Sequence, residues 1–148
     1  MIYIGADHRG FDLKQKIKQN LLDKGLQVID LGNDHLDEND DYVFFAHKVA
    51  QATSEDESNK GILLCGSGAG VDIVANKVDG IRSALVFDIK RAIQAREHED
   101  ANVISLPADT LDFDSALEIV NAFLETEFSN QDRHKRRLEE LSEVEQEH

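Results

Sequence analysis

The sequence predicts one α/β domain in three layers, a doubly wound, Rossmann-like parallel sheet of five strands with helices on both faces. Short β-rich segments alternate with longer segments of helical periodicity, which is the pattern of repeated right-handed βαβ units. The apolar run ILLC at 62–65 has no polar alternation, as is typical of a strand buried on both faces. A length of 148 residues suits a single domain, 1–148, with a real core.

Local patterns place each element in order. A β-rich strand covers 1–6, and apolar residues at helical spacing predict a helix over 11–25 that stops at Gly25, because glycine favours helix termination. A strand at 26–32 and a polar loop lead to a helix at 43–53. The remaining elements are strands at 60–66, 81–87 and 101–107, and helices at 69–78, 88–99, 114–128 and 131–147.

The last segment, 130–148, is a helix with very little apolar surface. Its apolar face consists of Leu138, Leu141 and Val144, too few to anchor a helix of this length on its own domain. We therefore expect this helix to dock on a neighbouring subunit, in a homodimer or tetramer.

Composition excludes several classes of function. The formal net charge of −14 would repel a polyanion, so nucleic acid is not an expected partner. The longest apolar runs are too short to cross a bilayer, and the N-terminus lacks the basic region of a signal peptide. One cysteine permits neither an intramolecular disulfide nor a zinc cluster. We expect a soluble cytoplasmic protein without a metal or a membrane partner.

Candidate chemistry lies at the carboxyl ends of the predicted strands, where open α/β sheets bind ligands. These ends carry the sequences ADH at 6–8, CGSGAG at 65–70, FD at 87–88 and LPAD at 106–109. The first two combine titratable or nucleophilic side chains with nearby glycine. The sheet edge beyond them is therefore the predicted site.

Cys65 admits three interpretations, a packing residue, a redox thiol or a reactive group. Free cysteine is most often a small buried side chain. Cys65, however, ends its strand and faces the start of a helix, which favours a thiolate. The glycine-rich turn after it is either a tight turn or an anion-binding set of N–H groups, and it matches neither a P-loop nor a dinucleotide motif. No second cysteine is present to resolve a redox reaction.

The histidines and arginines give weaker signals. Asp7 and His8 follow the first strand, where they are able to contact a substrate. His98 ends a helix and either binds the last carbonyl groups of that helix or serves the site. His35, His47 and His148 are interpreted as surface residues without a role in the site.

A basic cluster, RHKRR at 133–137, stands out in the acidic C-terminal segment. Arg133, Arg136 and Arg137 share one helix face at i, i+3 and i+4 spacing. They either pair with the glutamates that follow or bind an anion, for which a phosphate is the natural candidate.

These motifs in this order resemble the family of ribose-5-phosphate isomerase B and galactose-6-phosphate isomerase. GADHRGF at 5–11 is similar to its G-x-D-H-x-G-F, and CGSGAG at 65–70 is similar to its C-G-[TS]-G-x-G. The further matches, in family order, are DY at 41–42, ANKVDGIRSAL at 75–85, ANVI at 101–104 and RHKRR at 133–137. Each motif is weak alone, whereas the ordered set covers nearly the whole chain.

The resemblance implies aldose–ketose isomerisation of a phosphorylated sugar without a cofactor, first of all ribose 5-phosphate to ribulose 5-phosphate. Cys65 would move a proton between C1 and C2 through an enediolate. Ser67 and the N–H groups of the glycine-rich turn would hold that enediolate. The residues of this turn are Gly66, Ser67, Gly68, Ala69 and Gly70.

The other roles that the resemblance implies lie outside this turn. His98 of a partner subunit would help to open the sugar ring, in an active site shared between subunits. Asp7 would contact substrate hydroxyls. His8, Arg133 and Arg137 would hold the phosphate.

Four residues depart from the family pattern. Glu99 stands where asparagine is usual and offers a carboxylate to substrate hydroxyls; Val43 replaces a proline. Asp109 replaces the arginine of a G-S-R loop, and Asp72 replaces a small residue after the glycine-rich turn. Three of these changes predict a more acidic site. An isomerase of another sugar phosphate with four to six carbons, and a non-catalytic sugar-phosphate binder, therefore remain alternatives.

Overall fold

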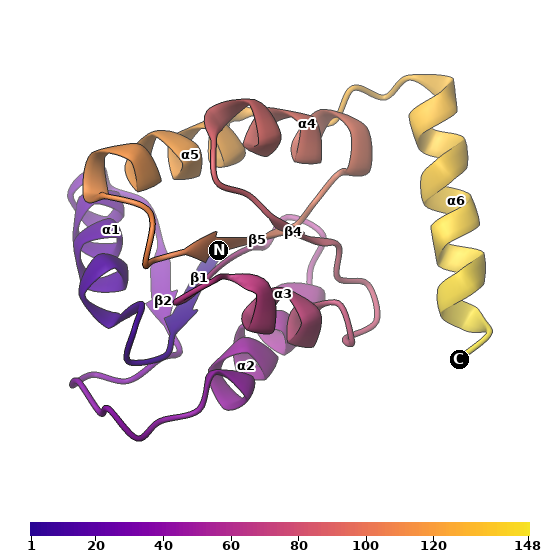
Figure 1. The fold of residues 1–148 in the computed structure, drawn as a ribbon. Helices are drawn as coiled ribbons and strands as arrows, with labels where there is room; N and C mark the ends of the chain where they lie inside the picture. Colours follow the sequence, from indigo (N-terminus) through magenta and orange to yellow (C-terminus); the bar gives the residue numbers. More distant parts are fainter.

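Five parallel strands form the centre of the protein in a computed structural model that describes residues 1–148 (Figure 1). The strands are β1 (Ile2–Ala6), β2 (Val28–Asp30), β3 (Lys60–Cys65), β4 (Ser83–Leu85) and β5 (Val103–Pro107). Their order in the sheet is β2-β1-β3-β5-β4. The carboxyl end of β3 therefore lies between those of β1 and β5, and Cys65 is in register with Pro107.

Helices cover both faces of this sheet, as the alternation of strands and helices predicts (Figure 1). The helices are α1 (Phe11–Asp23), α2 (Tyr42–Ser54), α3 (Ala69–Ala75), α4 (Ile89–Glu99), α5 (Phe113–Glu125) and α6 (Asp132–Gln146). One core cluster joins the sheet to α1, α4 and α5, and a second joins it to α2 and α3. The predicted three-layer, doubly wound fold is confirmed.

Side chains of β3 alternate between these two cores. Ile62 and Leu64 pack in the cluster with α1, α4 and α5, whereas Leu63 and Cys65 pack in the cluster with α2 and α3. All four are at most 4% exposed. A strand whose successive side chains point to opposite buried faces needs apolar residues at every position, which explains the uninterrupted run.

The two edge strands and α3 are shorter than the sequence predicts. β2 and β4 have three residues each, and α3 ends at Ala75. After α3, the side-chain amide of Asn76 pairs with the backbone of Ser83. Its Nδ2 donates to the Ser83 carbonyl (2.9 Å) and its Oδ1 accepts from the Ser83 N–H (2.8 Å). This clamp starts β4 at Ser83, two residues later than predicted.

Helix α6 stands apart from the three layers and contacts α4 (Figure 1). Leu141 and Val144 are 48% and 55% exposed, so the small apolar face of the helix is not covered by its own chain. No helix of the structure has the length and apolar character needed to cross a membrane.

Candidate functional site

A pocket of about 260 Å³ opens at the carboxyl edge of the sheet, beside Cys65. It is lined by Asp7, Arg9, Tyr42, Cys65, Gly66, Ser67 and Gly70. The residues come from the turn after β1, the start of α2 and the turn after β3. Because β1 and β3 are neighbours in the sheet, segments distant in sequence meet at this edge.

Cys65 is 4% exposed and its sulfur faces the glycine-rich turn. The Gly68 N–H donates a hydrogen bond to Sγ over 3.2 Å, and the Ala69 N–H donates to Ser67 Oγ, also over 3.2 Å. The hydrogen bond from Gly68 fixes the position of the sulfur against the turn. The turn therefore holds Cys65 in an arrangement suited to a base.

Glycine is required in this turn by backbone conformation and by close approach. Gly68 has φ +75°, and a Cβ there would lie 2.6 Å from Leu85 Cδ1. A Cβ at Gly70 would lie 2.7 Å from the ring of Tyr42. The N–H groups of Ser67 and Gly70 donate no hydrogen bond within the chain, so both are free for a ligand oxygen.

Asp7 has its carboxylate fixed at the rim of the pocket. Its Oδ1 accepts hydrogen bonds from the N–H groups of Arg9 (3.0 Å) and Gly10 (3.2 Å), and the residue is 6% exposed. Two backbone donors on one oxygen hold the side chain in a single orientation. The other oxygen, Oδ2, accepts no hydrogen bond within the chain.

His8 is held by Asp40, from the loop before α2. Asp40 Oδ1 accepts from the His8 N–H (2.8 Å) and lies 2.9 Å from the ring atom Nδ1. Asp40 Oδ2 accepts from Asn33 Nδ2, and the Asn33 carbonyl accepts from Nζ of the buried Lys14. The hydrogen bond to Asp40 raises the pKa of His8 above its ordinary value, with a smaller contribution from Asp7. A more basic His8 suits an anion ligand.

Replacing Asp40 with asparagine is expected to return the pKa of His8 toward its ordinary value near 6.5. The pair with Asp40 stabilises the folded protein at pH values below 6.5, and this contribution is lost as pH rises through the raised pKa of His8. An NMR titration of the imidazole measures the change. An unaltered titration of His8 in Asp40→Asn would contradict the assigned cause.

Two of the acidic departures from the family pattern have partners of their own. Asp72 Oδ1 accepts from Ser83 Oγ over 2.7 Å, and burial raises the pKa of Asp72, partly opposed by its hydrogen bonds with Ser83 and Ser105. No hydrogen bond joins it to Cys65. Asp109 forms an ion pair with Arg9. Arg9 thus offsets the charge of Asp109, whereas Asp72 is directed at Ser83 and Ser105 and not at Cys65.

A second group of predicted residues lies at the opposite edge of the sheet. Helix α4 starts just after β4 and runs back across the sheet, so His98 lies near the amino ends of the strands. The Ser129 N–H donates to the Glu97 carbonyl over 3.1 Å and ties the start of α6 to the end of α4. β5 alone spans about 13 Å at 3.3 Å per residue, which separates His98 from the Cys65 pocket of the same chain.

Helix α6 brings its basic residues to His98. The His134 ring lies 4.6 Å from the His98 ring, centroid to centroid, and Arg133 Nε lies 3.4 Å from His134 Nε2. Burial lowers the pKa of His134, and so do the neighbouring charges of His98, Arg133 and Arg137. Arg136 pairs with Glu140 at 3.8 Å, whereas Arg133 and Arg137 have no carboxylate partner. Two arginines therefore remain available for an anion.

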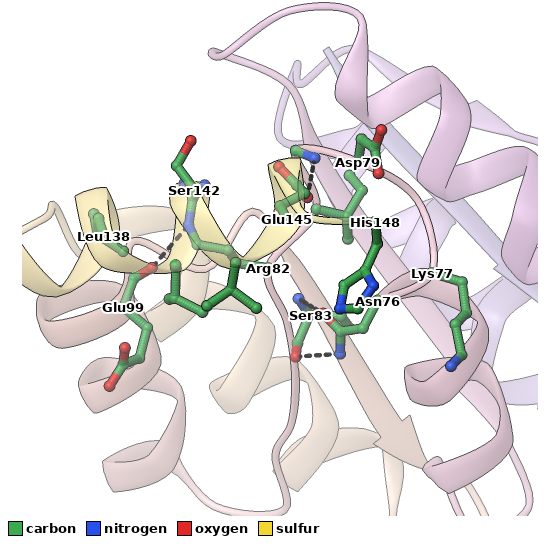
Figure 2. A pocket seen from close by; sticks show the side chains of 14 residues that line it. Asn76, Lys77, Asp79, Arg82, Ser83, Glu99, Leu138, Ser142, Glu145 and His148 are labelled. Atoms are coloured by element: carbon green, nitrogen blue, oxygen red, sulfur yellow. Dashed lines mark hydrogen bonds between the residues drawn. The ribbon is translucent and has the colours of Figure 1, made fainter.

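A larger groove of about 880 Å³ separates α6 from the turn between α3 and β4 (Figure 2). Leu138 and Val144 of α6 form part of one wall, and Arg82 and Glu99 lie on the other side. Glu145 accepts a hydrogen bond from the Gly80 N–H (2.7 Å) and holds the far end of α6. Glu99 is thus placed in this groove and not in the Cys65 pocket.

The predicted residues therefore fall into two groups within one chain. Asp7, Cys65 and the glycine-rich turn meet in the pocket, with His8 next to Asp7. His98, Glu99, Arg133 and Arg137 gather at the other edge.

The sequence interpretation gave no role to three residues that the structure places in these groups. Arg9 and Tyr42 line the Cys65 pocket, and His134 lies between His98 and Arg133. All three lie inside the motifs at 5–11, 41–42 and 133–137, and their place in these motifs is the signal that could have found them.

Residues 2–141 match the protein-family model described as Ribose/Galactose Isomerase. The ribose-5-phosphate isomerase B of Mycobacterium tuberculosis (strain CDC 1551 / Oshkosh) is 42% identical over 147 residues, which cover 99% of this chain and 91% of that protein. Ribose-5-phosphate isomerase B of Escherichia coli K12 is 37% identical over 145 residues, 98% of this chain and 96% of that protein.

Solved structures give the same match in three dimensions. Ribose-5-phosphate isomerase B from Mycoplasma genitalium, with bound ribulose-5-phosphate, superposes with a TM-score of 0.95 at 40% identity, over 99% of this chain and 97% of that chain. The Thermotoga maritima structure gives a TM-score of 0.91 at 43% identity, over 97% of both chains.

Proposed function

The chain belongs to the ribose/galactose isomerase family, and from this premise we propose that it interconverts ribose 5-phosphate and ribulose 5-phosphate. The observation that carries the proposal is the pocket in which Cys65, Asp7 and the free N–H groups of the glycine-rich turn meet. The similar Mycoplasma genitalium structure, which holds ribulose-5-phosphate, supports the choice of sugar.

In the proposed reaction, the Cys65 thiolate removes the proton from C2 of the open-chain aldose. Electrons of the C–H bond form the C1–C2 double bond of an enediolate, and negative charge moves to the oxygen on C1. Ser67 and the N–H groups of Ser67 and Gly70 stabilise that oxygen, because donors fixed in advance act where charge develops. The proton then returns from Cys65 to C1, and the proton of the C2 hydroxyl passes to the oxygen on C1, which gives the ketose and restores the thiolate. No step requires a cofactor.

The remaining proposed residues must come from a second copy of the chain. His98, Arg133 and Arg137 lie at the edge of the sheet opposite Cys65, with the full depth of the strands between them. A dimer that sets this edge of one chain against the Cys65 pocket of the other would complete each site. His98 would then assist ring opening, and both arginines would hold the phosphate together with His8.

Exposed apolar surface supports this assembly. Large apolar side chains on α2, α3 and the β4–α4 connection are not covered by their own chain. Phe44, Ile73 and Phe87 are 58%, 61% and 55% exposed. The groove beside α6 also lacks an occupant from its own chain. Apolar patches of this kind mark contact surfaces, and a second copy is the occupant that also completes the site.

A hydrogen-exchange assay tests the function. The protein is incubated in deuterated water with ribose 5-phosphate and with other aldose and ketose phosphates of four to six carbons, and NMR follows exchange at C1 and C2. We expect exchange to be fastest with the ribose 5-phosphate pair. Faster exchange with another sugar would identify a different substrate, and tight binding without any exchange would show a non-catalytic binder.

A further inference from the structure

Arg9 crosses the Cys65 pocket from one strand end to another. It lies in the turn after β1, and its guanidinium pairs with Asp109, which lies in the turn after β5. Between these strands is β3, and a Cβ at Gly66 would lie only 2.6 Å from the guanidinium carbon of Arg9 and 2.8 Å from Asp109 Oδ2. The ion pair therefore lies directly over the residue next to Cys65.

The main chain also fixes the Asp109 side of this bridge. The Asp109 N–H donates to the Gly66 carbonyl over 3.0 Å, and the Ala108 N–H donates to the Cys65 carbonyl over 2.9 Å. The turn after β5 is thereby locked to the turn after β3. On the other side, the Arg9 N–H donates to Asp7 Oδ1, and the Asp7 N–H donates to the Leu64 carbonyl over 3.4 Å, so the ends of β1, β3 and β5 are joined around one pocket.

The ion pair between Arg9 and Asp109 contributes little to the stability of the fold. The side chains of Arg9 and Asp109 are 57% and 40% exposed, and exposed ion pairs contribute only about 0–1 kcal/mol. The pair leaves most of the guanidinium unused, because only Nη2 donates a hydrogen bond within the chain. Arg9 is also the only basic side chain that lines the pocket.

From this placement we propose that Arg9 is a substrate-contacting residue, which donates hydrogen bonds to the oxygens at the reacting end of an open-chain sugar phosphate. Asp109 is its positioning residue, which holds the guanidinium over Gly66. The inference rests on the proposed isomerase function. Guanidinium N–H groups held in the pocket stabilise the enediolate, because its negative charge develops on the sugar oxygens.

Kinetics of three variants test this role. Arg9→Ala is expected to lower kcat/KM by roughly 10- to 100-fold, the effect of losing one charge-assisted hydrogen bond in the transition state. Arg9→Lys recovers only part, because an ammonium group lacks the planar fork of donors. Asp109→Asn gives a smaller loss than Arg9→Ala. Lys16→Ala, which removes an exposed positive charge on α1, is the control and retains full activity.

Calorimetric titration with ribose 5-phosphate gives a readout that does not need turnover. Arg9→Ala is expected to weaken binding, because the hydrogen bonds from the guanidinium are lost, while Lys16→Ala leaves the Kd unchanged. Arg9→Ala with wild-type kcat/KM and a wild-type Kd would overturn the inference. If the wild type isomerises no sugar phosphate, the proposed function fails instead, and the titration still decides whether Arg9 contacts the sugar phosphate.

Discussion

Cys65→Ser is expected to abolish most isomerase activity, with kcat/KM lowered by about 10²- to 10⁴-fold, the usual contribution of a general base. Serine keeps the size of the side chain and accepts the same hydrogen bond from Gly68. A hydroxyl, however, is not ionised near neutral pH, so no base remains to remove the proton from C2. Deuterium exchange at C1 and C2 of ribose 5-phosphate measures the loss.

The control separates chemistry from folding. Cys65 packs with Leu63 and Val71 in the core under α2 and α3, and a polar atom there costs stability of order 1 kcal/mol. Circular dichroism and a thermal melt are expected to show that Cys65→Ser is folded, and calorimetry is expected to show that it still binds the sugar phosphate. Exchange at the wild-type rate in this folded variant would remove Cys65 from the role of base.

The sequence predicted much of the fold because the signals are local. Each of the six helices was located from local sequence pattern, and the run before Cys65 identified the central strand that is buried on both faces. The order of the strands in the sheet has no such local signal, because it depends on which strands each helical crossover passes over. Nothing local shows that β5 inserts between β3 and β4. Edge strands were predicted too long because a single pairing partner leaves their ends unpaired.

In the candidate site, too, the features with a local sequence signal were predicted and the others were not. Cys65 and the glycine-rich turn were predicted because the residues that matter are adjacent in sequence. The pair of Arg9 and Asp109 joins residues 100 positions apart, so no spacing rule reveals it. Because the sequence does not reveal this pair, Asp109 was interpreted as added negative charge. Asp72 was interpreted in the same way, although it is directed at Ser83 and Ser105.

A heterodimer experiment gives the second large expected effect. One chain carries Cys65→Ser, the other carries Arg133→Ala with Arg137→Ala, and two affinity tags isolate the mixed dimer. Each variant alone is expected to be nearly inactive, because it lacks either the base or two charge-assisted contacts to phosphate. In a symmetric dimer with shared sites, the mixed dimer has one site with both lesions and one site with none. It should therefore recover about half of the wild-type activity.

The reciprocal dimer decides between shared and self-contained sites. Here all three substitutions are placed on one chain, and the partner chain is wild type. If sites are shared, each carries one lesion, and the dimer is nearly inactive although half of its chains are unaltered. If each chain holds a complete site, the wild-type chain keeps about half of the activity, and the first dimer has none. The separation of Cys65 from Arg133 and Arg137 across the sheet favours the shared arrangement, since one chain has no means of bringing them together without unfolding β3 and β5.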